Sequence, residues 1–527
     1  MAVEKLIVDH IDTWTTALQT RSTAGRGSSG KIDLYGIKKL RELILELAVR
    51  GKLVPQDPND EPASELLKRI AAEKAELVKL GKIKKPKPLP EISEEEKPFE
   101  LPVGWEWIQI SEIGHDWGQK TPDEDFTYID VGSINKEFGI IEEPSILSAK
   151  DAPSRARKIV QKGTVIYSTV RPYLLNIAII ESAFSPEPIA STAFAIIHPY
   201  TAMNANFIYY YLRSPVFINY VESCQTGVAY PAINDKQFFS GIIAVPPSSE
   251  QARITKKIKE LMSLCDQLEQ HSLTSLDAHQ QLVETLLTTL TDSQNAVELA
   301  ENWARISEHF DTLFTTEASI DALQQTILQL AVMGKLVPQD PNDSSAEILL
   351  EQLSTSRNKK LRQQQADNKE AETMLRKINK LKKAKPPFRL PNNWTTVHLI
   401  ELCEYLVDCH NKTAPYTDTG IPIIRTTNIR ERRFLEQDLK FISQETYDFW
   451  SKRCPPSPGD IIFTREAPMG EALIIPPNVK WCLGQRTMLI RVMHEFVSNE
   501  FLLLALTEPH LLERASVNAV GLTVKHL

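Results

Sequence analysis

Two stretches of the chain are nearly identical. Residues 48–60 read AVRGKLVPQDPND and residues 331–343 read AVMGKLVPQDPND, so twelve of thirteen positions match and only Arg50 differs from Met333. Immediately upstream, LRELILEL (40–47) corresponds to LQQTILQL (323–330). Solenoid repeats recur every ~20–50 residues, so a repeat this widely spaced indicates two copies of one large unit.

The repeat continues downstream in weaker form. FELPVGWEWIQI (99–110) corresponds to FRLPNNWTTVHL (388–399), and GVAYPAI (227–233) corresponds to GLTVKHL (521–527). Each copy therefore extends from its opening stretch into a larger segment.

A helix is predicted at the start of each copy, because apolar residues recur there at 3- and 4-residue spacing: Leu40, Ile44 and Leu47 in the first, Leu323, Ile327 and Leu330 in the second. Gly51 and Gly334 follow where a helix end favours a left-handed residue. The two prolines of LVPQDPND then require a turn.

A second helix, rich in Ala, Leu, Glu and Lys, is expected at about 61–80 and again at about 345–382. Both end in basic tracts, GKIKKPKP (81–88) and RKINKLKKAKP (376–386). The tracts are interpreted first as a solvated helix face and linker, and second as contacts for phosphates or an acidic partner.

A long helix is predicted at about 250–288. Its apolar residues alternate at spacings of four and three, which is typical of a coiled-coil seam, with Ser272 and His279 as polar interruptions: Ile254, Ile258, Leu261, Cys265, Leu268, Leu282 and Leu286. The expected partner is the helix with Ile320, Leu323, Ile327 and Leu330, returning antiparallel.

Segments 99–247 and 388–527 differ from the helical parts in their residue pattern. Short β-rich runs such as GTVIYSTV and GDIIFTRE are broken by Gly, Pro and Asn, and each segment has an apolar helical run near its end. The predicted fold class is α+β: two mixed α/β globular domains separated by long antiparallel coiled-coil-like helices, with a pseudo-twofold internal repeat.

Composition restricts the class of protein. Of 527 residues, 42% are hydrophobic and 24% charged, which excludes wholesale disorder. No apolar run approaches the roughly 18 residues of a membrane span, and MAVEKLIVDHIDTW is unlike a signal peptide, so a cytoplasmic location away from membranes is expected. Six cysteines form no CxxC pair, and the spacing of Cys403, Cys409 and His410 fits no common metal site.

The sequence contains no recognisable catalytic motif. It lacks a dinucleotide-binding G-x-G-x-x-G after a strand, a nucleophile elbow and an HExxH zinc motif. GRGSSGK (25–31) has Ile32 where a P-loop needs Ser or Thr, and is interpreted as a flexible loop. No catalytic residue and no metal ligand is predicted.

Polar loops in both globular segments suit recognition of base edges, for which Arg, Asn, Gln, Ser and Thr are the usual side chains. The candidates in the first segment are Ser168, Thr169, Arg171, Tyr173 and Asn176, with a weaker set of Gln225, Thr226 and Tyr230. Those in the second are Arg425, Thr426, Asn428, Arg430, Thr464, Arg465, Gln485 and Arg486. Exposed loops are polar in most proteins, so each set is a better candidate than any one member.

Charge argues against strong binding to DNA by the chain alone. The net charge is −8, with 10 basic against 15 acidic residues at 102–245 and 14 against 16 at 391–527. Because counterion release drives non-specific affinity, we expect a partner to supply much of the contact with phosphates.

The doubled GKLVPQDPND, the LPxxW that opens each globular segment, and PPSSEQARITKKIKELMSLCDQLE (246–269) resemble the DNA-specificity subunits of type I restriction-modification systems. The resemblance implies a non-catalytic subunit that reads a bipartite site on double-stranded DNA. It also implies two methyltransferase subunits and endonuclease/translocase subunits as partners. The long helices described above would hold the two globular domains apart and bind these partners. These partners, not this chain, would use S-adenosylmethionine, ATP and Mg²⁺.

The resemblance divides the chain into four parts: an N-terminal conserved helical region (1–98), target-recognition domain 1 (99–247), a central conserved helical region (248–387) and target-recognition domain 2 (388–527). The second copy ends without a counterpart of residues 234–290, so the distal conserved helix of the family is expected to be missing.

Two alternatives remain at this point. The first is a coiled-coil scaffold or inhibitory protein whose acidic domains bind basic partners without reading DNA. The second is an enzyme in its own right, which nuclease or methyl-transfer activity of the isolated chain would reveal.

Overall fold

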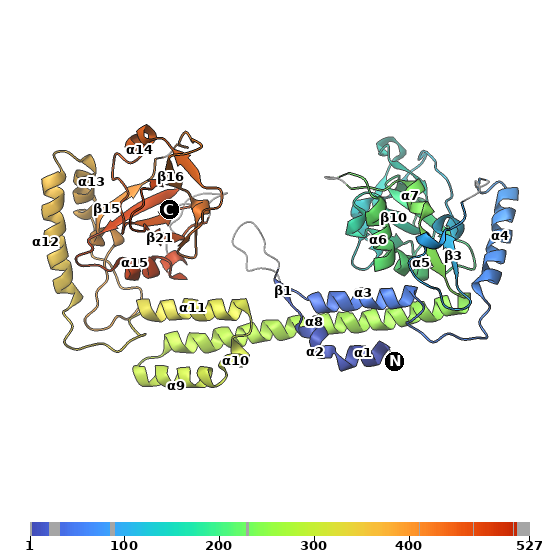
Figure 1. Ribbon diagram of the computed structural model, residues 1–527, viewed down its shortest axis with the longest axis horizontal. Helices are drawn as coiled ribbons and strands as arrows, with labels where there is room; N and C mark the ends of the chain where they lie inside the picture. The colour runs from blue at the N-terminus through green and yellow to red at the C-terminus, as the bar shows by residue number, and fades with distance from the viewer. Residues whose placement is uncertain are drawn as a thin grey trace. The chain divides into compact units, whose positions relative to one another are not determined.

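The computed structural model describes residues 3–20, 32–84, 90–227, 231–410, 412–466, 468–509 and 511–513. They form two compact units, one ending at Leu273 and one starting at Thr274. Helix α8 (Ser248–Asp292) begins in the first unit and ends in the second (Figure 1). Within the described ranges, no helix has the length and apolar content needed to cross a bilayer.

In the first unit, α3 (Tyr35–Val49) lies along the first half of α8 (Figure 1). Arg41 forms ion pairs of 2.6 Å with Asp266 and Glu269, whereas Gln56, beyond the end of α3, donates to Glu250 at 2.7 Å. The two helices are therefore antiparallel, and Ile254, Ile258 and Leu261 are buried as predicted. The other elements of this helical part are α1 (Val3–Asp9), α2 (Ile11–Thr16), α4 (Ala63–Lys79), β1 (Gln19–Thr20) and β2 (Ile32–Asp33).

The repeated GKLVPQDPND stretch needs its glycine for two reasons. Gly51 has φ +66°, and a Cβ there would lie 2.5 Å from Cγ of Pro102. Gly334 has φ +69°, and its Cβ would lie 2.6 Å from Cγ of Pro391. In both copies the turn after the opening helix is therefore held closely against the LPxxW stretch, which explains why the two motifs occur together.

Two four-stranded sheets form the first sheet domain. One has the order β11-β10-β13-β4 and the other β8-β5-β12-β9. Their strands are β4 (Gly114–His115), β5 (Phe126–Ile129), β8 (Ser145–Leu147), β9 (Ala156–Ile159), β10 (Val165–Ser168), β11 (Ile177–Ile179), β12 (Pro188–Ser191) and β13 (Phe194–Pro199). Around them lie the pairs β3 (Glu106–Gln109) with β14 (Ile242–Val245) and β6 (Ile134–Asn135) with β7 (Ile140–Ile141), and the helices α5 (Ala205–Leu212), α6 (Pro215–Cys224) and α7 (Asp235–Ser240).

The second sheet domain repeats this topology. Its sheets have the orders β15-β23-β20-β21 and β19-β16-β22, which match the first domain strand for strand apart from β9. The strands are β15 (Cys403–Asp408), β16 (Ile421–Ile424), β19 (Lys440–Ile442), β20 (Ile461–Thr464), β21 (Ala472–Ile474), β22 (Cys482–Leu483) and β23 (Thr487–Val492). The hairpin β17 (Ile429–Arg430) with β18 (Arg433–Phe434) takes the place of β6 with β7.

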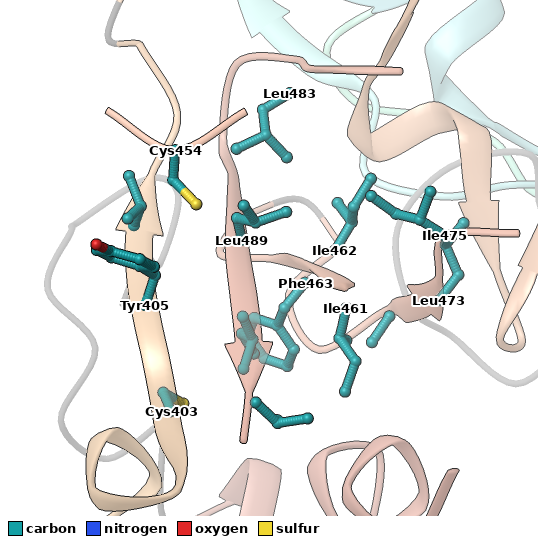
Figure 2. Packing of buried hydrophobic residues seen from close by; sticks show 14 of the residues in the cluster. Cys403, Tyr405, Cys454, Ile461, Ile462, Phe463, Leu473, Ile475, Leu483 and Leu489 are labelled. Atoms are coloured by element: carbon teal, nitrogen blue, oxygen red, sulfur yellow. The ribbon is translucent and has the colours of Figure 1, made fainter. Parts of the chain in front are cut away.

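The core of the second domain lies around its four-stranded sheet. Figure 2 shows Tyr405 and Cys403 from β15, Leu489 from β23, Ile461, Ile462 and Phe463 from β20, and Leu473 from β21. The helices α13 (Lys369–Ile378) and α15 (Asn499–Leu506) add Met374, Leu502 and Leu506 to this core, and α14 (Gln444–Trp450) packs near β22. Both domains thus mix helices and strands, as predicted.

The partner predicted for the whole of α8 was wrong. Its first half packs on α3, and the predicted helix packs only on the second half and in the other direction. Helix α9 (Ala296–Glu308) makes the return, followed by α10 (Phe310–Leu313) and α11 (Glu317–Val332). His279 lies 3.1 Å from the Thr312 carbonyl oxygen, and Lys335 donates to the carbonyls of Thr291 and Ser293, so α11 runs parallel to α8 (Figure 1). Helix α9, whose buried face is short, was not predicted.

The predicted seam is also out of register beyond Leu268, which is half-buried. Leu282 is 51% exposed, while its neighbour Val283 is buried with Leu287, Leu290, Leu323 and Leu330. Leu286 packs at the edge of this cluster. An α-helix drifts against a 3.5-residue repeat, and the seam positions Ser272, Ser275 and His279 are all polar, so no apolar residue at these positions keeps the register. Ile327, expected in the seam, is 41% exposed.

The helix predicted at 345–382 is two helices, α12 (Ala346–Gln364) and α13, because Asn368 caps the second by accepting from the N–H of Glu370. The loop GRGSSGK (25–31) and the stretch GLTVKHL (521–527) lie outside the described residues.

Candidate nucleic-acid interface

Each domain has candidate residues at one pair of equivalent strand ends. The Thr169 N–H donates to the Ala193 carbonyl at 2.9 Å just beyond β10 and β13. The Arg465 N–H donates to the Arg486 carbonyl at 2.9 Å just beyond β20 and β23. The strand registers agree, because Ser168 faces Phe194 as Thr464 faces Thr487. One scaffold therefore presents two unlike sets of side chains.

In the first domain the two predicted loops lie against each other. Val170 and Thr226 both form bridges with Ala232, and the Arg171 N–H donates to the Pro231 carbonyl at 2.8 Å. Arg171 has a left-handed backbone (φ +49°) and begins the 3-10 turn Pro172–Leu174, which leaves the Tyr173 ring half exposed. The set of Gln225 and Thr226, judged weaker from sequence, thus belongs to the same surface. Tyr230 lies outside the described residues.

Three predicted contacts of the first domain are corrected by burial. Ser168, Thr169 and Asn176 are buried, so their side chains do not reach the surface. The Ser168 hydroxyl donates to the Val170 carbonyl and the Thr169 hydroxyl to the Ala193 carbonyl, each at 2.9 Å. These side chains shape the loop, and their burial does not agree with the base contacts predicted for them.

Three candidates of the second domain are also buried: Thr426, Asn428 and Thr464. The Asn428 side chain accepts from the Arg425 N–H and donates to the carbonyls of Leu435 and Gln437. Thr464 donates to the Pro468 carbonyl. Arg430 folds back on the carbonyls of Thr426 and Ile429, so it too stabilises the loop.

The remaining second-domain candidates gather at one end of the sheet. The Gly484 N–H donates to the Ile424 carbonyl, Gln485 bonds to Thr413 at 3.2 Å, and the Arg486 N–H lies 3.2 Å from Sγ of Cys409. These contacts bring the loops after β15, β16 and β22 together. Gln485 and Arg486 are exposed.

Each arginine of this surface has a carboxylate neighbour. Arg465 lies 3.4 Å from Asp408, and Arg486 lies 3.2 Å from Glu466. Arg425 bonds to Asp438, whose pKa is lowered to about 2 by hydrogen bonds from Lys440 and Arg425. The pairing agrees with the weak net charge of the domain. These ion pairs would have to break before the arginines could bind DNA.

An aromatic group beside this surface was missed. The rings of His410 and Trp450 lie 4.5 Å apart, and the adjacent Phe449 is 60% exposed. His410 follows Cys409, so the group adjoins Arg486. The sequence could have indicated this group, because DFW (448–450) places two aromatic residues in a helix otherwise rich in polar residues. Thr192 was also not predicted. It is exposed and corresponds to Gln485 of the second domain. An alignment of STAFAII (191–197) with GQRTMLI (484–490) would have identified it.

No group of histidines, cysteines and carboxylates in the described residues could hold a metal ion. The six cysteines are free thiols, and burial raises the pKa of Cys403 to about 12, which keeps it protonated.

The sequence is similar to known proteins. A family model described as type I restriction modification DNA specificity domain matches residues 102–278, from the first sheet domain into α8. The type I restriction enzyme EcoAI specificity subunit of Escherichia coli is 49% identical over 523 residues, covering 95% of this chain and 86% of that protein. The chain belongs to the type I restriction enzyme specificity subunits.

A second specificity subunit, of the EcoEI enzyme of Escherichia coli, is 45% identical over 535 residues, with 96% of this chain and 86% of that protein covered. A solved chain from a study of the assembly and conformational transition of the type I R-M system covers 79% of this chain and 82% of that chain, at 21% identity and a TM-score of 0.45. The family assignment rests on the two close relatives.

Proposed function

We propose that this specificity subunit reads a DNA site in two separate halves, one with each sheet domain. The repeated topology carries the proposal, because the same strand ends present unlike side chains. The first domain offers Arg171 and Tyr173, and the second offers Gln485 and Arg486. Two related scaffolds with different contact residues suit two different half-sites.

In this proposal, partner subunits supply most of the phosphate contacts and the catalysis. The domains are net acidic, so phosphate contacts that drive DNA affinity must come largely from elsewhere. We infer that two methyltransferase subunits clamp the DNA beside the two domains, and that endonuclease/translocase subunits join the assembly. The chain itself catalyses nothing in this proposal. S-adenosylmethionine, ATP and Mg²⁺ are used by the partners, and the complex acts in the cytoplasm.

Selection from a random duplex library tests the proposal. The chain, co-purified with its methyltransferase subunit, should enrich a motif of two halves at fixed spacing. The double substitution of Gln485 and Arg486 by Ala should change only one half. Enrichment of nothing by an intact complex would contradict DNA reading and favour the scaffold alternative. Enrichment of a single continuous site would contradict the two-half arrangement.

A further inference from the structure

The hairpin of β17 and β18 in the second domain gathers basic side chains. Its sequence RERR (430–433) has three arginines in four positions, and Arg430 faces Arg433 across the two strands. Arg432 and Arg433 are exposed. In the described ranges of the chain their side chains form no ion pair and no hydrogen bond. They differ in this from the arginines at the strand ends, each of which has a carboxylate neighbour.

The Glu471 carboxylate holds the turn of this hairpin at the strand ends. It accepts from the Glu431 N–H at 2.8 Å, and the Glu471 carbonyl accepts from the Thr464 N–H, also at 2.8 Å. Thr464 directly precedes Arg465. The turn therefore lies beside the surface proposed to read DNA.

The base of the hairpin is anchored in the domain core. Ile429 is fully buried, and the rings of Phe434 and Trp481 lie 4.8 Å apart. Arg430 is held by the carbonyls of its own loop. A fixed support lowers the entropy that a ligand must overcome on binding, so the two exposed arginines are presented ready for contact.

The turn keeps charged residues where glycine would be less strained. Glu431 has φ +48° and Arg432 has φ +64°, a left-handed backbone that a Cβ disfavours. Two-residue turns of this kind most often have the sequence Asn-Gly. The corresponding turn of the first domain, KEFG (136–139), has Gly139 at φ +68°. An arginine in this strained position indicates a use for its side chain.

We propose that this hairpin binds the DNA backbone beside the half-site of the second domain, with Arg432 and Arg433 on phosphates. The inference rests on the proposed function, because it takes the strand ends as the reading surface. Side chains that read bases enter the major groove, and phosphates border that groove, so a contact beside the reading residues falls on phosphate. The arginine fork matches phosphate oxygens in geometry and charge. The hairpin thus gives a net acidic domain a contact that does not depend on sequence.

Salt titration of DNA binding by the chain, co-purified with its methyltransferase subunit, tests the proposal. Replacing Arg432 and Arg433 by Ala should weaken binding several-fold. It should also reduce the slope of log affinity against log salt by about 2, since each phosphate contact contributes about 0.9. The loss should be equal on the cognate duplex and on a duplex without the site, because phosphates carry no sequence information.

The double variant Lys359→Ala with Arg362→Ala is the charge-matched control. Both side chains are exposed cations of α12. The neighbouring Arg357 donates to the Glu401 carbonyl, at the opposite end of β15 from Asp408. Removing these two charges should change neither the affinity nor the salt slope.

Arg432→Gly separates DNA binding from folding. Glycine suits the left-handed backbone at this position, so the variant should unfold at a higher urea concentration than the parent. It should nevertheless bind DNA more weakly, because the cation is gone. A residue with a structural role alone would shift stability and binding in the same direction.

Three results would overturn the inference. Unchanged affinity and salt slope for the Arg432 and Arg433 double variant, in a complex that still prefers two half-sites, would leave the proposed function standing without the hairpin contact. A loss restricted to particular base changes would mean that the arginines read bases. Loss of the methyltransferase subunit from the purified complex would identify an acidic protein surface as the ligand.

Discussion

The Arg465 N–H donates to the Arg486 carbonyl at 2.9 Å, so two arginines leave adjacent strand ends at one point of the second domain. The corresponding pair in the first domain, Thr169 and Ala193, carries no charge. The two domains thus share a backbone arrangement and differ in the side chains that it presents. That difference determines which residues should affect each half-site.

Replacing Arg486 by Ala should weaken binding to the cognate site by roughly 5- to 150-fold, since a good bidentate contact between a side chain and a base discriminates by about 1–3 kcal/mol. The change in sequence preference should be confined to one half-site. Binding assays of the assembled complex on sites altered in either half would measure it.

Arg69→Ala provides the control for Arg486. Arg69 is an exposed arginine of α4 that forms an ion pair with Glu61. It should leave affinity and preference unchanged. An equal loss of affinity for both halves on changing Arg486 would mean that this arginine contacts phosphate and not a base.

Asn428→Ala should destabilise the second domain without giving a new base preference. The side chain is wholly buried and bonds to two carbonyls and one N–H of its own loop. Leaving a buried group without a partner costs about 1–3 kcal/mol, and three groups lose theirs here, so a loss of about 3 kcal/mol or more is expected. Urea unfolding followed by tryptophan fluorescence would measure the loss.

Thr427→Ala changes the exposed neighbour of Asn428 and should have little effect on unfolding. A stable Asn428→Ala protein with altered DNA preference would restore Asn428 as a base-reading residue.

The repeated units and the buried face of α8 could be predicted from the sequence. The doubled GKLVPQDPND identified two repeats, and the spacing of Ile254, Ile258 and Leu261 predicted the buried face of α8. Both patterns are local, because a turn and a helical stripe need only neighbouring residues. The return through α9 depends on packing among three helices, which no single pattern encodes.

Site residues were harder to predict, because exposure is a tertiary property. Arg486 and Asn428 have equally suitable side chains for reading bases, and only the fold exposes one and buries the other. The strand register that aligns Arg465 with Thr169 likewise becomes visible only once the sheets are formed. The aromatic group of His410 and Trp450 joins two segments 40 residues apart in sequence.

Gly51→Ala should destabilise the first unit more than Gly81→Ala. Both glycines have φ +66°, a backbone that costs a residue with a Cβ about 1–2 kcal/mol. At Gly51 the new Cβ would also lie 2.5 Å from Pro102, whereas at Gly81 it would meet no atom within 4 Å. Thermal unfolding of the two variants separates strain from collision. Equal shifts in the midpoint would show that Pro102 moves aside without cost.

Asp60 should make the first unit sensitive to acid. The Arg253 guanidinium, with help from Ser249, lowers the pKa of this carboxyl below its ordinary value. A lowered folded-state pKa adds stability above the unfolded pKa, which is about 3.9, and that stability is lost as the pH falls through the folded value. Asp60→Asn should therefore be less stable than the parent at pH 7, and the difference should shrink below about pH 4.

The repeat provides the control for Asp60. Asp343→Asn alters the counterpart carboxylate, which forms no ion pair with any residue that the structure describes, so it should not change the slope of stability against pH. Chemical unfolding between pH 3 and pH 7 measures both variants. A stability difference for Asp60→Asn that stayed constant down to pH 3 would mean that hydrogen-bond geometry, and not charge, joins the turn to α8.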